Sequence, residues 1–367
     1  MSIHAARRER LLAQIRHDQL DGMLVTNPVN VTYLTGFSGE ASPLIISTKK
    51  TILVSDGRFP TQIAEECPDL ETYIRPQIQT ITEAAAHNLN LLGIKKVGCE
   101  SNQLTLADFA AISDKTPTID WQKSTDRVER LRATKDESEI AQIKDAIRIA
   151  ERAFAMFRAM LTPEDREKDL VDAMESYVRR AGGKSTAFPT IVAVGPRGAL
   201  PHAPPTATRV CEAPSLLVDW GANGPFYKSD LTRVLFTHGG NANGVDPKLR
   251  QMHAAARRAQ LAAIGVLRPG VEAHEVDAAA RKSLEADGML QYFNHGLGHG
   301  IGIQIHEAPF FRPGNTMKIA VGMVVTIEPG VYLPGYAGVR LEDDVLVTED
   351  GPVVLTSVPR EIDECIV

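Results

Sequence analysis

Short apolar runs alternate with amphipathic stretches over about the first 120 residues of the chain. Runs rich in β-branched residues and bounded by Asn, Pro or Gly predict strands, and apolar positions three and four apart predict helices. The predicted strands are residues 22–26, 31–34, 43–47, 51–55 and 96–100. The predicted helices are residues 1–20, 59–66, 81–92 and 104–113. Strands that alternate with helices indicate an α/β layer domain.

The pattern changes after a charged stretch, residues 125–136. Asp136 with Glu139 three residues later is typical of a helix start, and Ile140, Ile143 and Ile147 form an apolar helix face. The predicted helices here are residues 136–161, 164–182, 247–267 and 273–286. The predicted strands are residues 190–194, 216–220, 229–233, 324–330 and 339–347. Helices before and between antiparallel hairpins predict an α+β domain, so we expect an α/β domain at 1–131 and an α+β domain at 132–367.

The first of these hairpins, residues 216–233, carries two aspartates. If Gly224 and Pro225 form a two-residue loop, residues whose numbers sum to 449 lie opposite each other, which places Asp219 across from Asp230. Carboxylates directly opposed on one face lie about 5 Å apart and repel each other unless a cation lies between them. Two solvated aspartates on a surface hairpin are the alternative.

The second hairpin repeats this arrangement with glutamates. A three-residue loop at 334–336 pairs residues whose numbers sum to 670, which places Glu328 across from Glu342. Four carboxylates and a neutral imidazole form a ligand set that suits Mn²⁺, Co²⁺, Zn²⁺ or Fe²⁺. Four acids exceed what one divalent ion needs, so the pattern favours two ions about 3.5 Å apart.

A glycine-rich segment supplies the imidazoles. His295 and His299 alternate with glycines as His-Gly-Leu-Gly-His-Gly-Ile-Gly, and His306 follows seven residues later. The glycines disfavour a helix and indicate backbone that approaches another group closely. Three histidines within twelve residues favour metal binding or acid–base chemistry over a purely structural role.

Composition narrows the class of protein. The chain has 367 residues, 43% of them apolar and 23% charged, which is typical of a globular protein with two domains. A net charge of −6 is not typical of a protein that binds nucleic acid. No apolar run reaches the roughly 18 residues of a membrane span. The N-terminal stretch lacks the apolar core of a signal peptide. Four scattered cysteines without a Cys-x-x-Cys pair predict reduced thiols in a cytoplasmic protein.

Five motif blocks in this order resemble the metallopeptidases with the pita-bread fold, specifically the Xaa-Pro aminopeptidase (aminopeptidase P) and Xaa-Pro dipeptidase (prolidase) group. The blocks are Val218–Ala222, Ser229–Arg233, His295–Gly302 with His306-Glu307, Thr326–Gly330 and Val339–Asp343. The resemblance covers the whole second domain and implies a duplicated helix pair with an antiparallel sheet. The first domain is similar to the non-catalytic, creatinase-like N-terminal domain of the same group.

The resemblance also implies roles for individual residues. The five expected ligands of a di-metal centre are Asp219, Asp230, His299, Glu328 and Glu342, with Asp230 and Glu342 at the bridging positions. Catalytic roles are implied for Glu328, as general base, and for His306, His202 and His295. Substrate contacts are implied for His202, His295, His306 and Arg340, with Arg340 also supporting the cluster.

The implied activity is cleavage of the bond before a proline, by a hydroxide that bridges two divalent ions, with Mn²⁺ favoured and Co²⁺, Zn²⁺ or Fe²⁺ as alternatives. The partners would be proline-containing peptides, with no nucleic acid or membrane, and the family suggests a homodimer. Removal of the first residue from longer peptides, an Xaa-Pro aminopeptidase, is favoured over an Xaa-Pro dipeptidase restricted to dipeptides. A non-enzymatic binding protein and methionine aminopeptidase chemistry are further alternatives.

Overall fold

The computed structural model describes residues 2–237 and 244–367. The chain divides into two compact units, Met1–Arg132 and Ala133–Val367. Within the described residues, no helix is long and apolar enough to cross a membrane. All four cysteines are free, and Cys67, Cys99 and Cys365 are buried.

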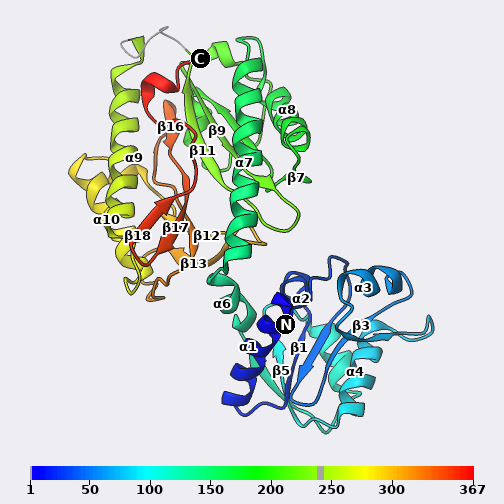
Figure 1. The fold of residues 1–367 in the computed structure, drawn as a ribbon. Coiled ribbons are helices and arrows are strands. Elements are labelled where there is room, and N and C mark those ends of the chain that lie inside the picture. Colours follow the sequence, from blue (N-terminus) through cyan, green and yellow to red (C-terminus); the bar gives the residue numbers. More distant parts are fainter. Residues whose placement is uncertain (1, 238–243) are drawn as a thin grey trace. The chain divides into compact units, whose positions relative to one another are not determined.

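The first unit is a six-stranded sheet, in the order β4-β3-β2-β1-β5-β6, with six helices (Figure 1). Its strands are β1 (Gly22–Val25), β2 (Leu44–Ser47), β3 (Thr51–Ser55), β4 (Glu71–Ile74), β5 (Lys96–Glu100) and β6 (Asp120–Ser124). Its helices are α1 (Ile3–His17), α2 (Pro28–Thr35), α3 (Pro60–Glu66), α4 (Ile81–Leu92), α5 (Leu106–Ser113) and α6 (Arg127–Ala133). The β1–β2 and β2–β3 pairs are antiparallel, whereas the β3–β4, β1–β5 and β5–β6 pairs are parallel.

The predicted strand at 31–34 is wrong, because these residues belong to helix α2. The Asn27 side chain accepts a hydrogen bond from the Val29 amide, and Pro28 occupies the first helical turn. Asn-Pro here is therefore a helix start and not a turn between strands. Strands β4 and β6 were not predicted, because they lie at the two edges of the sheet and have too few buried residues to show an alternation.

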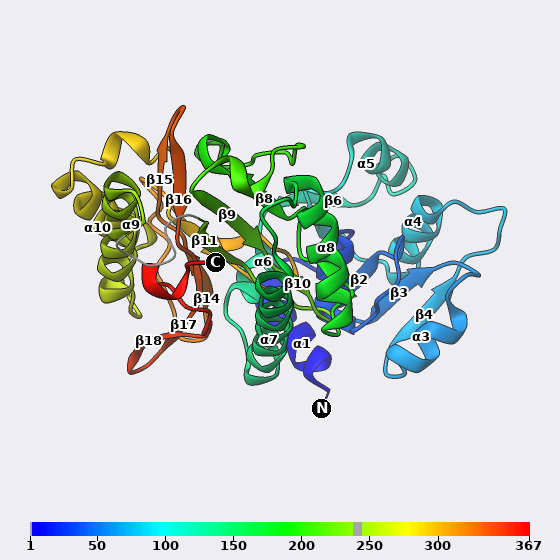
Figure 2. The same cartoon turned by 90° about the horizontal axis from the view of Figure 1, so that it is seen from above.

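The second unit contains two helix pairs with strands between them (Figures 1 and 2). The first pair is α7 (Glu137–Met160) with α8 (Glu167–Arg180), and the second is α9 (Pro247–Val266) with α10 (Ala273–Ala286). Helices α7, α9 and α10 form within one residue of the predicted bounds. The duplicated helix pair and the antiparallel sheets confirm the predicted α+β, pita-bread class.

The strands in the described residues of this unit form four sheets. β8 (Ile191–Val194), β9 (Ser215–Trp220) and β11 (Leu231–Phe236) form a three-stranded sheet. A five-stranded sheet has the order β13-β12-β14-β17-β18. Its strands are β12 (Gly298–Gly300), β13 (Glu307–Phe311), β14 (Val324–Ile327), β17 (Asp343–Thr348) and β18 (Gly351–Val354). The two-stranded ladders are β7 (Ser185–Thr186) with β10 (Ala222–Asn223), and β15 (Gly330–Leu333) with β16 (Ala337–Arg340). Short 3-10 helices are η1 (Gly195–Ala199), η2 (Val210–Glu212), η4 (Leu290–Tyr292) and η5 (Ile362–Glu364).

The register predicted for the first hairpin is wrong, because its two-residue loop lies one residue later in the chain than predicted. Asp219 pairs with Thr232, so the numbers of opposed residues sum to 451 and not to 449. The Gly224 amide donates to the Tyr227 carbonyl, which makes Pro225 and Phe226 the centre of the turn. Proline prefers the first central position of a β-turn, since its φ is fixed there. Asp230 is therefore a diagonal neighbour of Asp219 on the same face.

The register predicted for the second hairpin is confirmed. Gly330 pairs with Arg340 in the ladder of β15 and β16, and Ile327 pairs with Asp343 in the ladder of β14 and β17, so both ladders sum to 670. Glu328 and Glu342 lie in the short gap between these two ladders. At this gap the chain passes from one sheet to another. Strands β14 and β17 belong to the five-stranded sheet, whereas β15 and β16 pair only with each other.

Candidate metal centre

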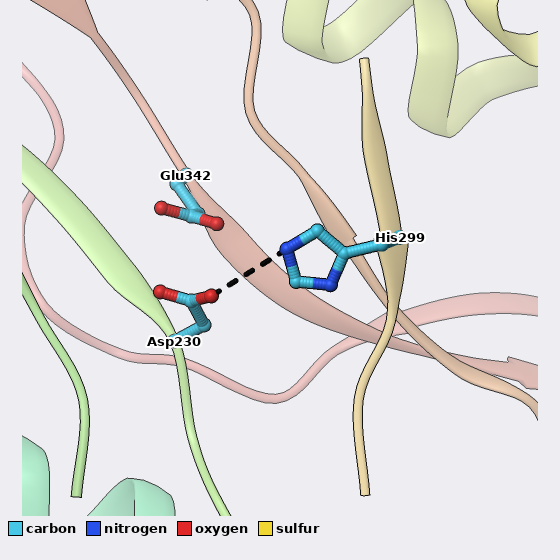
Figure 3. Close-up of side chains that lie close together, drawn as sticks. All are labelled: Asp230, His299 and Glu342. Carbon is cyan, nitrogen blue, oxygen red and sulfur yellow. Dashed lines mark ion pairs between the residues drawn. The ribbon is translucent and has the colours of Figure 1, made fainter. Parts of the chain in front are cut away.

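The expected metal ligands lie at strand ends that meet in the second unit. Asp219 is on β9, Asp230 immediately precedes β11, and His299 is the central residue of β12. Glu328 follows β14, and Glu342 immediately precedes β17. An isolated bridge between Thr232 and Glu342 connects β11 to the start of β17 and draws the acidic ends together. Figure 3 shows the side chains of Asp230, His299 and Glu342 directed toward a common point.

The distances between these side chains fit shared coordination. One ligand atom each of Asp230, His299 and Glu342 lies within 4.8 Å of the others. Nε2 of His299 lies 3.7 Å from Oδ2 of Asp230 and 3.5 Å from Oε1 of Glu328. Two ligands of one ion, each bonded at about 2.1 Å, lie at most about 4.2 Å apart. His299 is thus close enough to Asp230 and to Glu328 to share an ion with either carboxylate.

The acids of this group repel each other in a buried setting. Burial, followed by the charges of neighbouring carboxylates, raises the pKa of Asp230 and Glu342 well above their usual values. Burial also raises the pKa of Asp219, and it raises the pKa of Glu328 to about 8. Such shifts mean that the chain by itself stabilises the ionised acids poorly. A divalent cation would remove this penalty.

One oxygen tests directly whether the residues fit a metal. Asp219 is only 7% exposed, and its Oδ1 is buried without a hydrogen-bond partner in the described structure. A buried carboxylate oxygen without a donor is costly unless another group binds it. His299 is equally suited, because its Nδ1 lies 3.1 Å from the Gly300 carbonyl. A proton on Nδ1 leaves the lone pair of Nε2 for a metal. The donor set therefore fits divalent ions.

Close backbone packing explains the glycines around His299. A Cβ atom on Gly298 would lie 2.2 Å from the Thr326 carbonyl oxygen, so no larger residue fits there. The His299 amide donates to Oγ1 of Thr326 at 3.0 Å, which holds β12 against β14. This contact confirms the close approach that the glycines predicted.

Arg340 is the one cation in direct contact with the acidic group in the described structure. It is 3% exposed, and its Nη2 donates to Oδ2 of Asp219 at 2.5 Å. Its Nε donates to Oγ1 of Thr232 at 3.0 Å, and its Nη1 donates to the Tyr332 hydroxyl at 2.9 Å. The Tyr332 oxygen also lies 2.8 Å from Nε2 of His295. Arg340 and Tyr332 thus connect Asp219 to His295.

The other predicted histidines border a cavity of about 870 Å³ that opens onto the acids. His202, His295 and His306 all line it, and the His306 ring lies edge-on to His299 with centroids 4.4 Å apart. Burial lowers the pKa of His295 to about 4, so this ring is neutral at pH 7. Apolar side chains form much of the remaining wall, among them those of Phe188, Pro189, Ile191, Phe310 and Phe311.

Four polar residues of this centre were not predicted from the sequence. The Thr232 hydroxyl donates to Oε2 of Glu342 at 2.6 Å, and the Thr326 hydroxyl donates to Oε1 of Glu328 at 3.4 Å. Tyr332 joins Arg340 to His295, and the Asp344 carboxylate accepts from the Asp230 amide at 3.2 Å. Side chains alternate between the two faces of a strand, and this is the only signal that could have indicated Thr232 and Thr326. Each threonine is two residues from a predicted ligand and therefore lies on the same face.

Comparisons with known proteins agree on the family to which this chain belongs. Residues 141–349 match the model of metallopeptidase family M24, and residues 7–134 match the creatinase/prolidase N-terminal domain. The chain is 30% identical to an Xaa-Pro dipeptidase of Pyrococcus horikoshii, over 99% of this chain and 100% of that protein.

Two solved structures resemble the chain over nearly all of both proteins. One is an Xaa-Pro dipeptidase from Bacillus anthracis, 32% identical, with a TM-score of 0.92 over 99% of this chain and 100% of that one. The other is an X-Pro aminopeptidase from Thermotoga maritima, 31% identical, with a TM-score of 0.88 over 98% and 100%.

Proposed function

Since this chain belongs to metallopeptidase family M24 and is therefore an enzyme, we propose that it is a di-metal Xaa-Pro dipeptidase. The sequence alone favours an aminopeptidase, with the dipeptidase as the alternative. Relatives with both names exist among similar structures, and the Pyrococcus relative that matches the whole chain is a dipeptidase. The choice between the two activities rests on the cavity.

The observation that carries the dipeptidase proposal is the placement of Arg312. Its side chain is exposed and lines the cavity. Within residues 2–237 and 244–367, no ion pair joins its guanidinium to a carboxylate. An Xaa-Pro dipeptide carries a carboxylate on its proline, and a guanidinium binds a carboxylate through two parallel hydrogen bonds. A longer peptide has a neutral amide at that position and gains less from the charge.

The proposed ligands are Asp219, Asp230, His299, Glu328 and Glu342. Divalent ions held there would supply Lewis-acid activation of the scissile carbonyl and of water at neutral pH. Glu328, half-buried beside His299, would accept a proton and return it to the proline nitrogen. His306 and His202 would donate to the oxygen that gains charge, and His295 would border the substrate.

The cavity wall suits the residue after the cleaved bond. The Xaa-Pro bond is a tertiary amide without an N–H, so a site cannot select it through a donor from the scissile nitrogen. Phe188, Pro189 and Phe311 offer apolar surface to the pyrrolidine ring. Shape and apolar contact would therefore provide the selectivity for proline.

The proposal is tested with Ala-Pro and Ala-Pro-Ala on metal-loaded protein. We expect kcat/KM for the dipeptide to exceed that for the tripeptide by about tenfold or more, a difference of at least 1.4 kcal/mol. Arg312→Ala should raise KM for Ala-Pro about tenfold and change KM for the tripeptide less than twofold. Arg268→Ala, at an exposed arginine outside the cavity, is the matched control.

Faster cleavage of the tripeptide, with no effect of Arg312→Ala, would support the aminopeptidase instead. Cleavage of neither peptide with Mn²⁺, Co²⁺ or Zn²⁺ would exclude both. The same reconstitution series tests the predicted preference for Mn²⁺, and light scattering tests the predicted homodimer.

A further inference from the structure

A buried ion pair lies beside the metal centre without lining the cavity. Nζ of Lys135 lies 3.4 Å from Oε2 of Glu307, and the two side chains are 0% and 4% exposed. Lys135 precedes α7, and Glu307 is the first residue of β13. Neither is among the residues that border the substrate cavity. A pair of charges so fully removed from water is seldom worth much stability, so it calls for another role.

The Glu307 carboxylate lies at the centre of the loop that precedes it. Its Oε1 accepts a hydrogen bond from the Gln304 amide at 2.9 Å. A Cβ atom on Gly302 would lie 2.7 Å from each of the two carboxylate oxygens, so the backbone there lies directly against the carboxylate. The backbone of residues 302–304 thus lies against the Glu307 carboxylate, and Nζ of Lys135 pairs with Oε2 of the same group.

The same loop is anchored at two further places. The Lys228 amide donates to the Gly302 carbonyl at 2.9 Å, and the Ile301 amide donates to the Val324 carbonyl at 3.0 Å. Its two isoleucines, with Ile301 just before it, pack in one apolar cluster with isoleucines of α7. That cluster includes Ile140, Ile143, Ile147, Ile301, Ile303 and Ile305.

The end of this loop enters the metal centre. His306 immediately precedes Glu307 and lines the cavity, with its ring edge-on to His299. His306 itself is exposed, and no hydrogen bond between its ring and another residue is found in the described structure. The direction of the ring is therefore set by the backbone on either side of it, and Glu307 fixes that backbone.

We propose that Glu307, held by Lys135, is a positioning residue that fixes the 302–306 loop and so holds His306 against the substrate. The inference rests on the proposed peptidase function. An apolar pair of similar volume could replace the two charges with little loss of stability, but it could not accept the Gln304 amide hydrogen bond. Stability and positioning can therefore be separated by mutation.

The variant that separates them is Lys135→Met/Glu307→Leu. It removes both buried charges together, so we expect its melting temperature and metal content to match those of the wild type. Its kcat for Ala-Pro should fall about tenfold, because a misplaced catalytic group typically costs that much or more. Its KM should change less than twofold. Arg258→Met/Asp287→Leu, which removes an exposed pair far more accessible to water, should leave both constants unchanged.

His306→Ala completes a double-mutant cycle. In the His306→Ala background, the Lys135→Met/Glu307→Leu change should lower kcat less than twofold, because the group that it positions is already absent. A tenfold loss in both backgrounds, or a wild-type kcat for the stable charge-free variant, would overturn the proposal.

Hydrogen exchange provides a readout that does not depend on the substrate. The Gln304 amide should exchange at least about tenfold faster in Lys135→Met/Glu307→Leu than in the wild type, since it has lost its acceptor. Unchanged exchange would overturn the proposal. If the wild type cleaves no Xaa-Pro peptide, the proposed function fails, and faster Gln304 exchange still supports the loop role of Glu307.

Discussion

Glu342 and Asp343 are consecutive acids that face opposite sides of the chain, and their surroundings differ sharply. Both Asp343 oxygens are bound: Oδ1 lies 2.7 Å from Nη2 of Arg233, and Oδ2 lies 2.7 Å from Nε of Arg360. Thr356 and Gln260 donate to the same carboxylate. Glu342 receives a side-chain hydrogen bond from Thr232 and faces other acids.

The difference shows in the pKa values. Burial opposes ionisation of Asp343, but Arg233 and Arg360 outweigh it and lower its pKa. For Glu342, burial and the charges of Glu328 and Asp219 raise the pKa well above normal. One side of the strand is thus neutralised by the protein itself. On the other side, four carboxylates face one arginine, and that imbalance is what a metal would correct.

The largest expected effect comes from removing an acid on the metal side. Asp230→Ala should lower kcat for Ala-Pro by more than about a thousandfold. The reason is that the proposed metal ions lose a ligand that they share and on which the reaction depends. Without metal, the variant should be at least as stable as the wild type, since a repelling charge is gone. Kinetics, metal analysis and thermal melts check this, with Asp350→Ala in an exposed turn as the control. A fully active variant would show that the ligand assignment is wrong.

On the Asp343 side of the strand, which the protein's own arginines neutralise, a substitution should lower the free energy of unfolding. Arg233→Met leaves Asp343 short of one buried partner, and breaking such a pair typically costs about 3–5 kcal/mol of unfolding free energy. Urea unfolding measures this, and Arg258→Met at an exposed ion pair should cost less than about 1 kcal/mol. A cost below 1 kcal/mol for Arg233→Met would remove the contrast between the two sides.

His253, near Arg233 on the Asp343 side, makes the stability of the fold sensitive to acid. Burial lowers its pKa to about 4, and its surroundings contain the charges of Glu361, Arg257 and Arg233 and the backbone of Arg360. Because the folded pKa lies below the usual 6.5, the unfolded state binds the proton more readily, so stability present above pH 6.5 is lost as the pH falls toward 4. Relative to His253→Leu, the wild type should lose on the order of 3 kcal/mol across this window. Urea unfolding at pH 7, 5.5 and 4 checks it, and a pH-independent difference would contradict it.

The smallest expected effect is on metal affinity. Thr232→Val removes the hydroxyl that donates to Glu342 and accepts from Arg340. Loss of such a supporting hydrogen bond typically weakens metal binding about 10–100-fold. With saturating metal, kcat should stay within a few-fold of the wild type. Metal titration followed by activity checks this, and unchanged affinity would mean that Thr232 is not needed to orient Glu342.

The sequence by itself determined several helices and the residue types that gather at the candidate centre. Apolar periodicity and capping residues predicted α4, α7, α9 and α10 to within one residue, because these signals lie within each element. Residue type and spacing selected the acids and histidines that the structure brings together, and loop length alone gave the register of the second hairpin.

Only the tertiary structure decided how those groups are held. The turn at Gly224–Tyr227 shifted the first register, and the pairing of Thr232 with Glu342 depends on two strands 110 residues apart. The same holds for Arg340 on Asp219 and for Lys135 on Glu307. Contacts of this kind arise when distant strands and loops pack together, so no periodicity within a single segment encodes them.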